Sequence, residues 1–235
     1  MHLAILMTNT DESDFAARHP KDGEKFADLI HMARPGWQVS VFSAKDGVFP
    51  EDIAAFDGAM ITGSPASVGD DRPWIAPLMD LIRDMHARKQ PLFGACFGHQ
   101  AIALALGGAL GSNPCGWVQG LTLNTLQKTP PWTRELPDPL GLYGSHKECV
   151  SALPDGAVQT ATSNGMIAGF TVGQHIWTTQ HHPEMSHEFI SALTKEMQGM
   201  LPEEVFAQAL ESLADRSDQA RFAEALARFF EQGTR

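Results

Sequence analysis

The feature that most constrains the fold is a strand, a tight turn and a helix that meet at one cysteine. Residues 91–95 form a short apolar run, Cys96 stands between Gly94 and Gly98, and small apolar residues continue to Gly108. Glycines two residues before and after a nucleophile allow a strained strand-to-helix turn, the nucleophile elbow, to pass close to its neighbours. The N-terminus of the following helix favours thiolate over thiol. Cys96 is therefore a candidate nucleophile, with a buried packing cysteine as the alternative.

The N-terminal half alternates apolar strands with helical segments. Strands are predicted at 3–7, 37–42, 58–62 and immediately before Cys96, and helices at 23–33, 74–88 and 98–106. Continuous apolar strands are typical of a sheet buried on both faces, and the β-α order predicts a doubly wound, mostly parallel sheet with helices on both faces. Ligands bind such sheets at the carboxyl ends of the strands. Because Gly63-Ser64-Pro65 and Cys96 both follow strands, we expect them on one rim.

The chain beyond Gly111 changes to short strands separated by turns, followed by helices. Strands are predicted at 120–126, 140–143, 157–163, 167–172 and 176–180, some of them antiparallel, with a hairpin turn at Gly173-Gln174. Helices are predicted at 186–200, 202–213 and 217–231, the last with an apolar side. We therefore expect one α/β domain over residues 1–190 and a C-terminal helical extension, residues 191–235, that packs on the same domain.

Charge and cysteine content limit the partners. The net charge is -11 and the 17 Lys and Arg residues are scattered, which argues against nucleic acid. Cys96, Cys115 and Cys149 are an odd number without C-x-x-C spacing, so neither a disulfide framework nor a zinc knuckle is indicated. No apolar run approaches a membrane-spanning length, and the start lacks a basic n-region and a cleavage site. We expect a cytoplasmic protein that acts on a small molecule, without nucleic-acid or membrane partners.

A second group of polar residues follows the last predicted strand. His182 and Glu184 flank Pro183, which bends the backbone so that the carboxylate can reach one imidazole nitrogen while the other faces the sulfur. Such a Cys-His-Glu set moves the proton from thiol to leaving amine. A metal site at His181 and His182 is disfavoured because adjacent strand residues point to opposite faces and no further ligand has suitable spacing. A polar surface loop is the other alternative.

Four motifs, in this order and spacing, resemble the class I glutamine amidotransferases with a Cys-His-Glu triad. They are Gly63-Ser64-Pro65, the segment Gly-Ala-Cys-Phe-Gly-His-Gln at 94–100, Ser145-His146, and His182-Pro183-Glu184. The resemblance covers roughly residues 1–190 and is greatest to the stand-alone, GMP-synthase-like group. It implies a flavodoxin-like α/β fold with extra antiparallel strands and C-terminal helices.

The resemblance also implies a catalytic triad. Cys96 matches the nucleophile that attacks the γ-carboxamide, and His182 and Glu184 match its two partners. No metal and no cofactor is implied.

Further positions match the family's oxyanion hole and substrate contacts. The backbone N–H groups of Ser64 and Phe97 match the oxyanion donors, in keeping with their predicted places at strand ends. Gln100 and Ser145 match positions that contact the amino-acid end of glutamine, and His146 is similar to a neighbour of that site.

The chain departs from the family's common pattern in ways that affect function. Ser64 stands where many members have Gly, and Lys147-Glu148 follows Ser-His where Asp or Gly is common. There is no Gly-rich ATP-pyrophosphatase loop, so we do not expect GMP synthesis by this chain alone. Two classes of function follow. One is a thiol hydrolase of γ-glutamyl amides, as a self-sufficient γ-glutamyl peptidase or as a glutaminase that supplies ammonia to a separate synthetase subunit; the other is a non-catalytic binding subunit.

Overall fold

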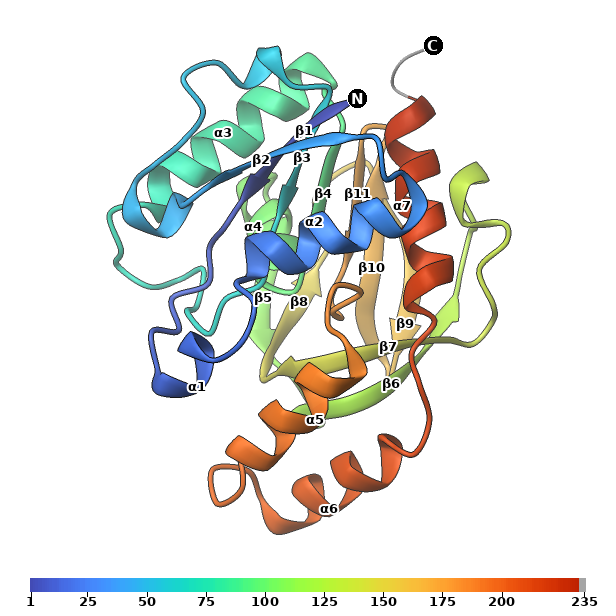
Figure 1. Ribbon diagram of the computed structural model, residues 1–235. Helices are drawn as coiled ribbons and strands as arrows, with labels where there is room; N and C mark the ends of the chain where they lie inside the picture. Colours follow the sequence, from blue (N-terminus) through green and yellow to red (C-terminus); the bar gives the residue numbers. More distant parts are fainter. Residues whose placement is uncertain (233–235) are drawn as a thin grey trace.

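The computed structural model, which describes residues 1–232, has a central sheet whose core is parallel (Figure 1). The five parallel strands lie in the order β2 (Gln38–Phe42), β1 (His2–Leu6), β3 (Gly58–Ile61), β4 (Leu92–Ala95) and β11 (Ile176–Thr179). All five match the predicted strands to within one residue, with β1 lying one residue earlier than predicted. The expected doubly wound sheet is therefore confirmed.

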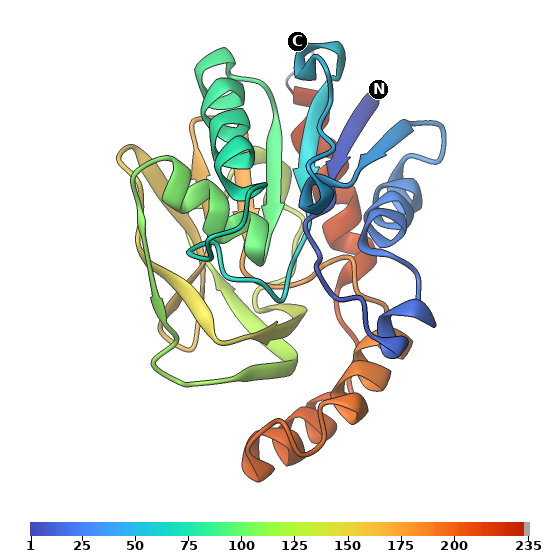
Figure 2. The same cartoon turned by 90° about the vertical axis from the view of Figure 1, so that its left-hand side faces the viewer.

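Helices cover both faces of this parallel core (Figure 2). One face carries α3 (Ile75–Arg88) and α4 (Phe97–Ala105), whose apolar sides join a core cluster with β3 and β4. The other carries α2 (Asp22–Ala33) and α7 (Gln219–Gln232), which pack against each other and against β1 and β11. Both faces being buried explains why the strands are uniformly apolar.

The antiparallel part of the sheet extends the core beyond β11. It contains β10 (Met166–Val172), β9 (Ala157–Ser163), β6 (Val118–Leu126) and β7 (Leu140–His146) in that order. The predicted hairpin at residues 173–174 is confirmed, since Val172 pairs with Ile176.

Sequence reasoning missed β5 (Ala109–Ser112) and β8 (Glu148–Ala152), which pair with each other, and the one-turn helix α1 (Asp14–Ala17). Both strands are short and lack a clear alternation of apolar and polar residues, which is the pattern that identifies a strand in a sequence. β5 has no fully buried residue, and β8 has only two. β8 matters for the site, since Glu148 at its start borders the cavity described below.

The C-terminal helices have different surroundings. α5 (His187–Glu196) and α6 (Glu203–Ser212) form a hairpin that projects from the carboxyl end of the sheet, and α7 returns to the core (Figures 1 and 2). On α7, Phe222 stacks on Trp177 of β11 with ring centroids 4.8 Å apart. The division of the chain at residue 190 stays a prediction, but α7 lies within a main apolar cluster. No helix within residues 1–232 is long and apolar enough to cross a membrane.

Candidate active site

Cys96 occupies the strained turn between β4 and α4. Its backbone has φ 51° and ψ -104°, a combination that non-glycine residues rarely adopt and that is characteristic of functional sites. A Cβ on Gly94 would lie 2.6 Å from the carbonyl carbon of Gly98, and one on Gly98 would lie 2.6 Å from the carbonyl oxygen of Ile61. Both glycines are thus required by close backbone approach, as the elbow motif predicts.

His182 and Glu184 lie at the end of the neighbouring strand β11. The backbone N–H of His182 donates to the carbonyl oxygen of Tyr143 at 2.7 Å, which holds the turn after β11 against β7. Nδ1 of His182 is 2.7 Å from Oε1 of Glu184, and both side chains are almost fully buried. Because Nδ1–H donates to the carboxylate, Nε2 is the nitrogen left to exchange a proton with a reacting group.

The imidazole and the cysteine meet over a glycine. A Cβ on Gly63 would lie 2.7 Å from Cε1 of His182 and 3.7 Å from Cβ of Cys96, so both side chains border the space above this residue. The bond from the Cys96 N–H to the Thr179 carbonyl at 2.9 Å fixes the two strand ends side by side. The three predicted triad residues are therefore brought together.

Electrostatics favour a protonated His182. Burial is the largest single influence and lowers the pKa of His182. The Glu184 carboxylate and then the Cys96 sulfur raise it, and together they outweigh burial, so the pKa lies well above the ordinary value. A cationic imidazole beside the sulfur stabilises a thiolate. The pair therefore suits nucleophilic attack followed by proton donation.

The adjacent His181 has different surroundings. Its Nδ1 is 2.7 Å from Oδ1 of Asn124 on β6, its side chain is fully buried, and burial together with His146 holds its pKa well below the ordinary value. Within residues 1–232, no group of three or more His, Cys, Asp or Glu side chains is arranged to hold a metal ion.

The two predicted oxyanion donors lie on the same rim. Ser64 follows β3 by three residues, and Phe97 is the first residue of α4. Among the described residues, neither N–H donates to a protein acceptor. Both amides are therefore available to donate to a developing oxyanion, which is one requirement of an oxyanion hole.

The three predicted substrate-contact residues border the same cavity, but their polar groups differ in availability. The Gln100 amide is occupied, since its Nε2 donates to the Glu148 carbonyl at 3.0 Å and to Oε1 of Gln180 at 3.2 Å. Nδ1 of His146 also donates to the Glu148 carbonyl, and burial lowers the pKa of His146 to about 4. Within residues 1–232 the Ser145 hydroxyl meets only the Met197 sulfur, at 4.0 Å, and it is the most available of the three.

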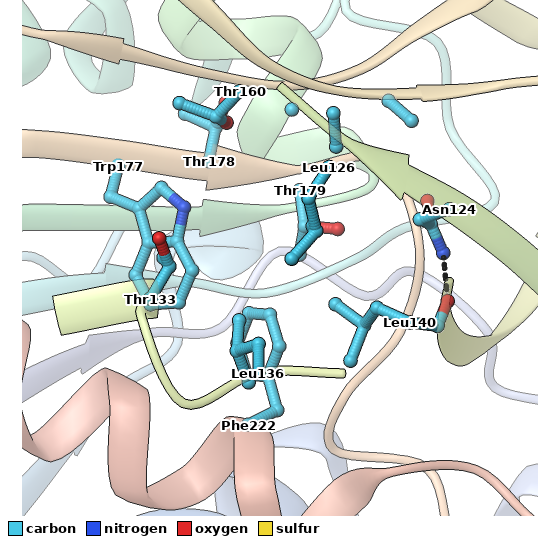
Figure 3. Close-up of a pocket in the computed structure, with 13 residues that line it drawn as sticks. Asn124, Leu126, Thr133, Leu136, Leu140, Thr160, Trp177, Thr178, Thr179 and Phe222 are labelled. Atoms are coloured by element: carbon cyan, nitrogen blue, oxygen red, sulfur yellow. Dashed lines mark hydrogen bonds between the residues drawn. The ribbon is translucent and has the colours of Figure 1, made fainter. Parts of the chain in front are cut away.

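A cavity of about 720 Å³ opens over Cys96 and His182. A second cavity, between the sheet and α7, is bordered by Trp177, Leu140 and Phe222 (Figure 3) and has only about 20 Å³, room for about one water molecule. None of the predicted site residues borders the smaller cavity. The larger one is therefore the candidate substrate site, and its size falls in the range of small-molecule pockets.

Sequence reasoning missed two contributors to this site. One is the role of Gly63, which was expected on this rim but not as the residue whose missing side chain leaves space for the His182 ring. The other is α5, from which Phe189 and Leu193 border the cavity together with Met197, the residue that caps the helix. The four-residue spacing of these apolar side chains can be seen in the sequence. It indicates that they share one side of a helix but not which part of the protein that side contacts.

A family comparison agrees with this geometry. The sequence model of the family "Glutamine amidotransferase class-I" matches residues 29–192, more than half of the chain. The chain belongs to this family. Class I glutamine amidotransferases are generally cysteine hydrolases that act on glutamine amide bonds.

Individual class I relatives carry two kinds of name. The chain is 31% identical over 196 residues to gamma-glutamyl peptidase 3 of Arabidopsis thaliana, with 79% of each chain covered. It is also 31% identical over 142 residues to one subunit of the glutamine-hydrolysing GMP synthase of Halobacterium salinarum, covering 59% of this chain and 71% of that one.

Solved structures of glutamine amidotransferases share the fold. A glutamine amidotransferase from Thermotoga maritima superposes with a TM-score of 0.76 at 19% identity, covering 98% of this chain and 97% of that one. One from Methylobacillus flagellatus gives 0.73 at 23% identity, covering 99% and 94%. The fold predicted from the sequence is thereby confirmed.

Proposed function

We propose that this protein hydrolyses the γ-glutamyl amide bond of small molecules through a thioester on Cys96, as a self-sufficient γ-glutamyl peptidase. The observation that carries the proposal is the buried His182–Glu184 pair beside a cysteine on a strained elbow. The similarity to gamma-glutamyl peptidase 3 over 79% of the chain supports the peptidase form. The cytoplasmic location stays a prediction.

In the first half-reaction the Cys96 thiolate attacks the γ-carbonyl carbon. The negative charge that develops on the carbonyl oxygen is held by the Ser64 and Phe97 N–H groups. The C–N bond then breaks, and the amine leaves with the proton that Nε2 of His182 donates. The products are a γ-glutamyl thioester and a free amine, or ammonia when the substrate is glutamine.

In the second half-reaction the now neutral imidazole takes a proton from water, and the resulting hydroxide adds to the thioester. Breaking the C–S bond releases glutamate and restores the thiolate beside the cationic His182. Glu184 keeps the proton on Nδ1 throughout, so the other nitrogen always faces the reacting atoms. The two half-reactions together consume one water molecule and return Cys96 and His182 to their starting protonation states.

The test is a turnover screen of the purified protein. Glutamine, glutathione and γ-glutamyl dipeptides are incubated with it, and glutamate and amine are measured, with Cys96→Ser as the control. We expect release from at least one γ-glutamyl compound, and loss of most of it in the variant.

A second candidate function is a glutaminase that needs a synthetase partner, which the similarity to the GMP synthase subunit favours. No turnover of any γ-glutamyl compound, while a glutamine-like diazo-ketone still alkylates Cys96, would replace the peptidase proposal with this one.

A further inference from the structure

The cavity is bordered on one side by a helix face that is apolar and incompletely covered. Phe189, Leu193 and Met197 are spaced four residues apart, border the cavity and are each partly exposed. The adjacent strip of α5 faces the protein, since Ile190 and Thr194 are fully buried and Thr194 accepts a hydrogen bond from Gln119 at 2.9 Å. The partly exposed edge of the apolar side of α5 therefore borders the space that contains Cys96.

The remaining cavity walls differ in chemistry. The loops after β1 and β3 and the start of β8 contribute polar and charged side chains, among them Asn9, Ser67 and Glu148, whereas every cavity-lining residue between 185 and 197 is apolar. The charged ends of a γ-glutamyl group belong on the polar walls, because a charged group placed against the apolar wall loses its hydration without compensation. Because the Ser145 hydroxyl lies beside Met197 at one end of this wall, the part at Phe189 and Leu193 is the one suited to an uncharged, apolar group.

The cavity also exceeds what glutamine needs. At about 720 Å³ it falls within the range that holds drug-sized ligands, whereas the leaving group of glutamine is only ammonia. With the γ-glutamyl group on the polar walls, the remaining volume is bordered by Phe189 and Leu193. A substrate that fills it has a bulky group attached to the γ-glutamyl nitrogen.

The apolar wall is held in place before any ligand binds. Nζ of Lys25 lies 3.4 Å from the centroid of the Phe189 ring, and the rings of Phe15 and His19 pack on the same side chain at 5.9 and 5.3 Å. Lys25 is itself fixed by Asp22 at 2.8 Å. Little ordering of side chains is then needed on binding, which favours affinity and discrimination.

We infer that the α5 wall, defined as Phe189 and Leu193, sets substrate specificity by binding an uncharged, bulky apolar side chain on the leaving amine. The preferred substrates are γ-glutamyl derivatives of amino acids such as phenylalanine or leucine, ahead of γ-glutamylglycine and free glutamine. This inference rests on the proposed function, because the apolar group belongs to the amine that is released when the Cys96 thioester forms.

The proposed specificity of the α5 wall is tested by comparing kcat/KM for two substrates. The ratio of kcat/KM for γ-glutamylphenylalanine to that for γ-glutamylglycine is expected to be about tenfold or more in the wild type. Leu193→Asn keeps the size but adds polarity, so the ratio should fall by about tenfold, mainly through KM for the phenylalanine substrate. Leu193→Met should keep most of the discrimination. A purely structural defect would lower both rates and leave their ratio unchanged.

The matched control is Leu210→Asn, an exposed leucine on α6 that does not border the cavity; it should leave the ratio unchanged. Equal kcat/KM values for the two substrates in the wild type, or an unchanged ratio in Leu193→Asn, would overturn the inference.

Binding separates this inference from the proposed function. In Cys96→Ala protein, calorimetry should show γ-glutamylphenylalanine bound about tenfold more tightly than γ-glutamylglycine. If the wild type turned over no γ-glutamyl amide, the peptidase proposal would fail, and this measurement would still decide the apolar preference. Equal affinities would reject it.

Discussion

Gly63→Ala gives a sharp test of the proposed triad, because it adds one methyl group beside the imidazole without removing any functional atom. The new Cβ would lie 2.7 Å from Cε1 of His182. Carbon atoms in favourable contact are about 3.5 Å apart or more, so the ring or the glycine backbone must move by about 0.8 Å.

Neither side of this contact moves freely. The His182 ring is buried and fixed by the 2.7 Å bond to Glu184, and the Gly63 carbonyl oxygen lies 3.1 Å from the Thr8 hydroxyl. A misplacement of about 1 Å in a catalytic group reduces the rate by about 100-fold, equivalent to about 2.7 kcal/mol of transition-state free energy. Overpacking should also lower the free energy of unfolding by about 1–3 kcal/mol.

The assay compares kcat/KM on the best substrate, the rate of Cys96 alkylation, and the melting temperature. Gly36→Ala is the matched control, because its Cβ would meet nothing within 4 Å. We expect the Gly63 variant to stay folded and lose about 100-fold in kcat/KM, with the control unchanged. Activity within about threefold of the wild type would refute the placement of His182 over Gly63 as the catalytic geometry.

Four further results are expected. A glutamine-like diazo-ketone should label Cys96 and neither Cys115 nor Cys149 on peptide mapping, and Cys96→Ser should lose most turnover while keeping its melting temperature; labelling elsewhere with Cys96 untouched contradicts the assignment. His182→Ala should reduce kcat/KM nearly as much as the loss of Cys96, and the two effects should not add. His181→Ala should mainly lower the free energy of unfolding, by about 1–3 kcal/mol, because Asn124 loses its buried partner. The reverse pattern would make His181 the base. The pKa of His182 is raised in the folded protein, so the stability that protonated His182 contributes is complete below its unfolded pKa near 6.5 and is lost as pH rises through the folded pKa. Glu184→Gln removes a carboxylate that raises this pKa, so the alkaline limb of the kcat/KM profile should shift to lower pH. An unmoved limb argues against the pairing of His182 with Glu184. Phe222→Ala should reduce the free energy of unfolding in urea by about 3–5 kcal/mol, because a fully buried ring that stacks on Trp177 is removed; a loss below about 1 kcal/mol would show that α7 is dispensable for the core.

Several parts of this protein follow from the sequence alone because they depend on local spacing. Glycines flanking Cys96 are compatible with a strained elbow, and apolar runs of four to six residues between helices specify a parallel sheet buried on both faces. The rule that ligands bind at carboxyl ends of strands then places Cys96, Ser64 and His182 on one rim. The structure agrees with each of these expectations, and the family comparison confirms the membership that the motifs implied.

Other features were decided only by tertiary structure. The short strands β5 and β8 form because each supplies the other's hydrogen-bonding partner, which no pattern within either strand reveals. The space over Gly63 exists only once β3 and β11 bring that glycine under the His182 ring. On α5, a period of four residues places Phe189, Leu193 and Met197 on one face, but long-range packing determines that this face borders a cavity rather than the core. Local sequence fixes which side chains lie together on an element, whereas what they meet depends on segments far away in the chain.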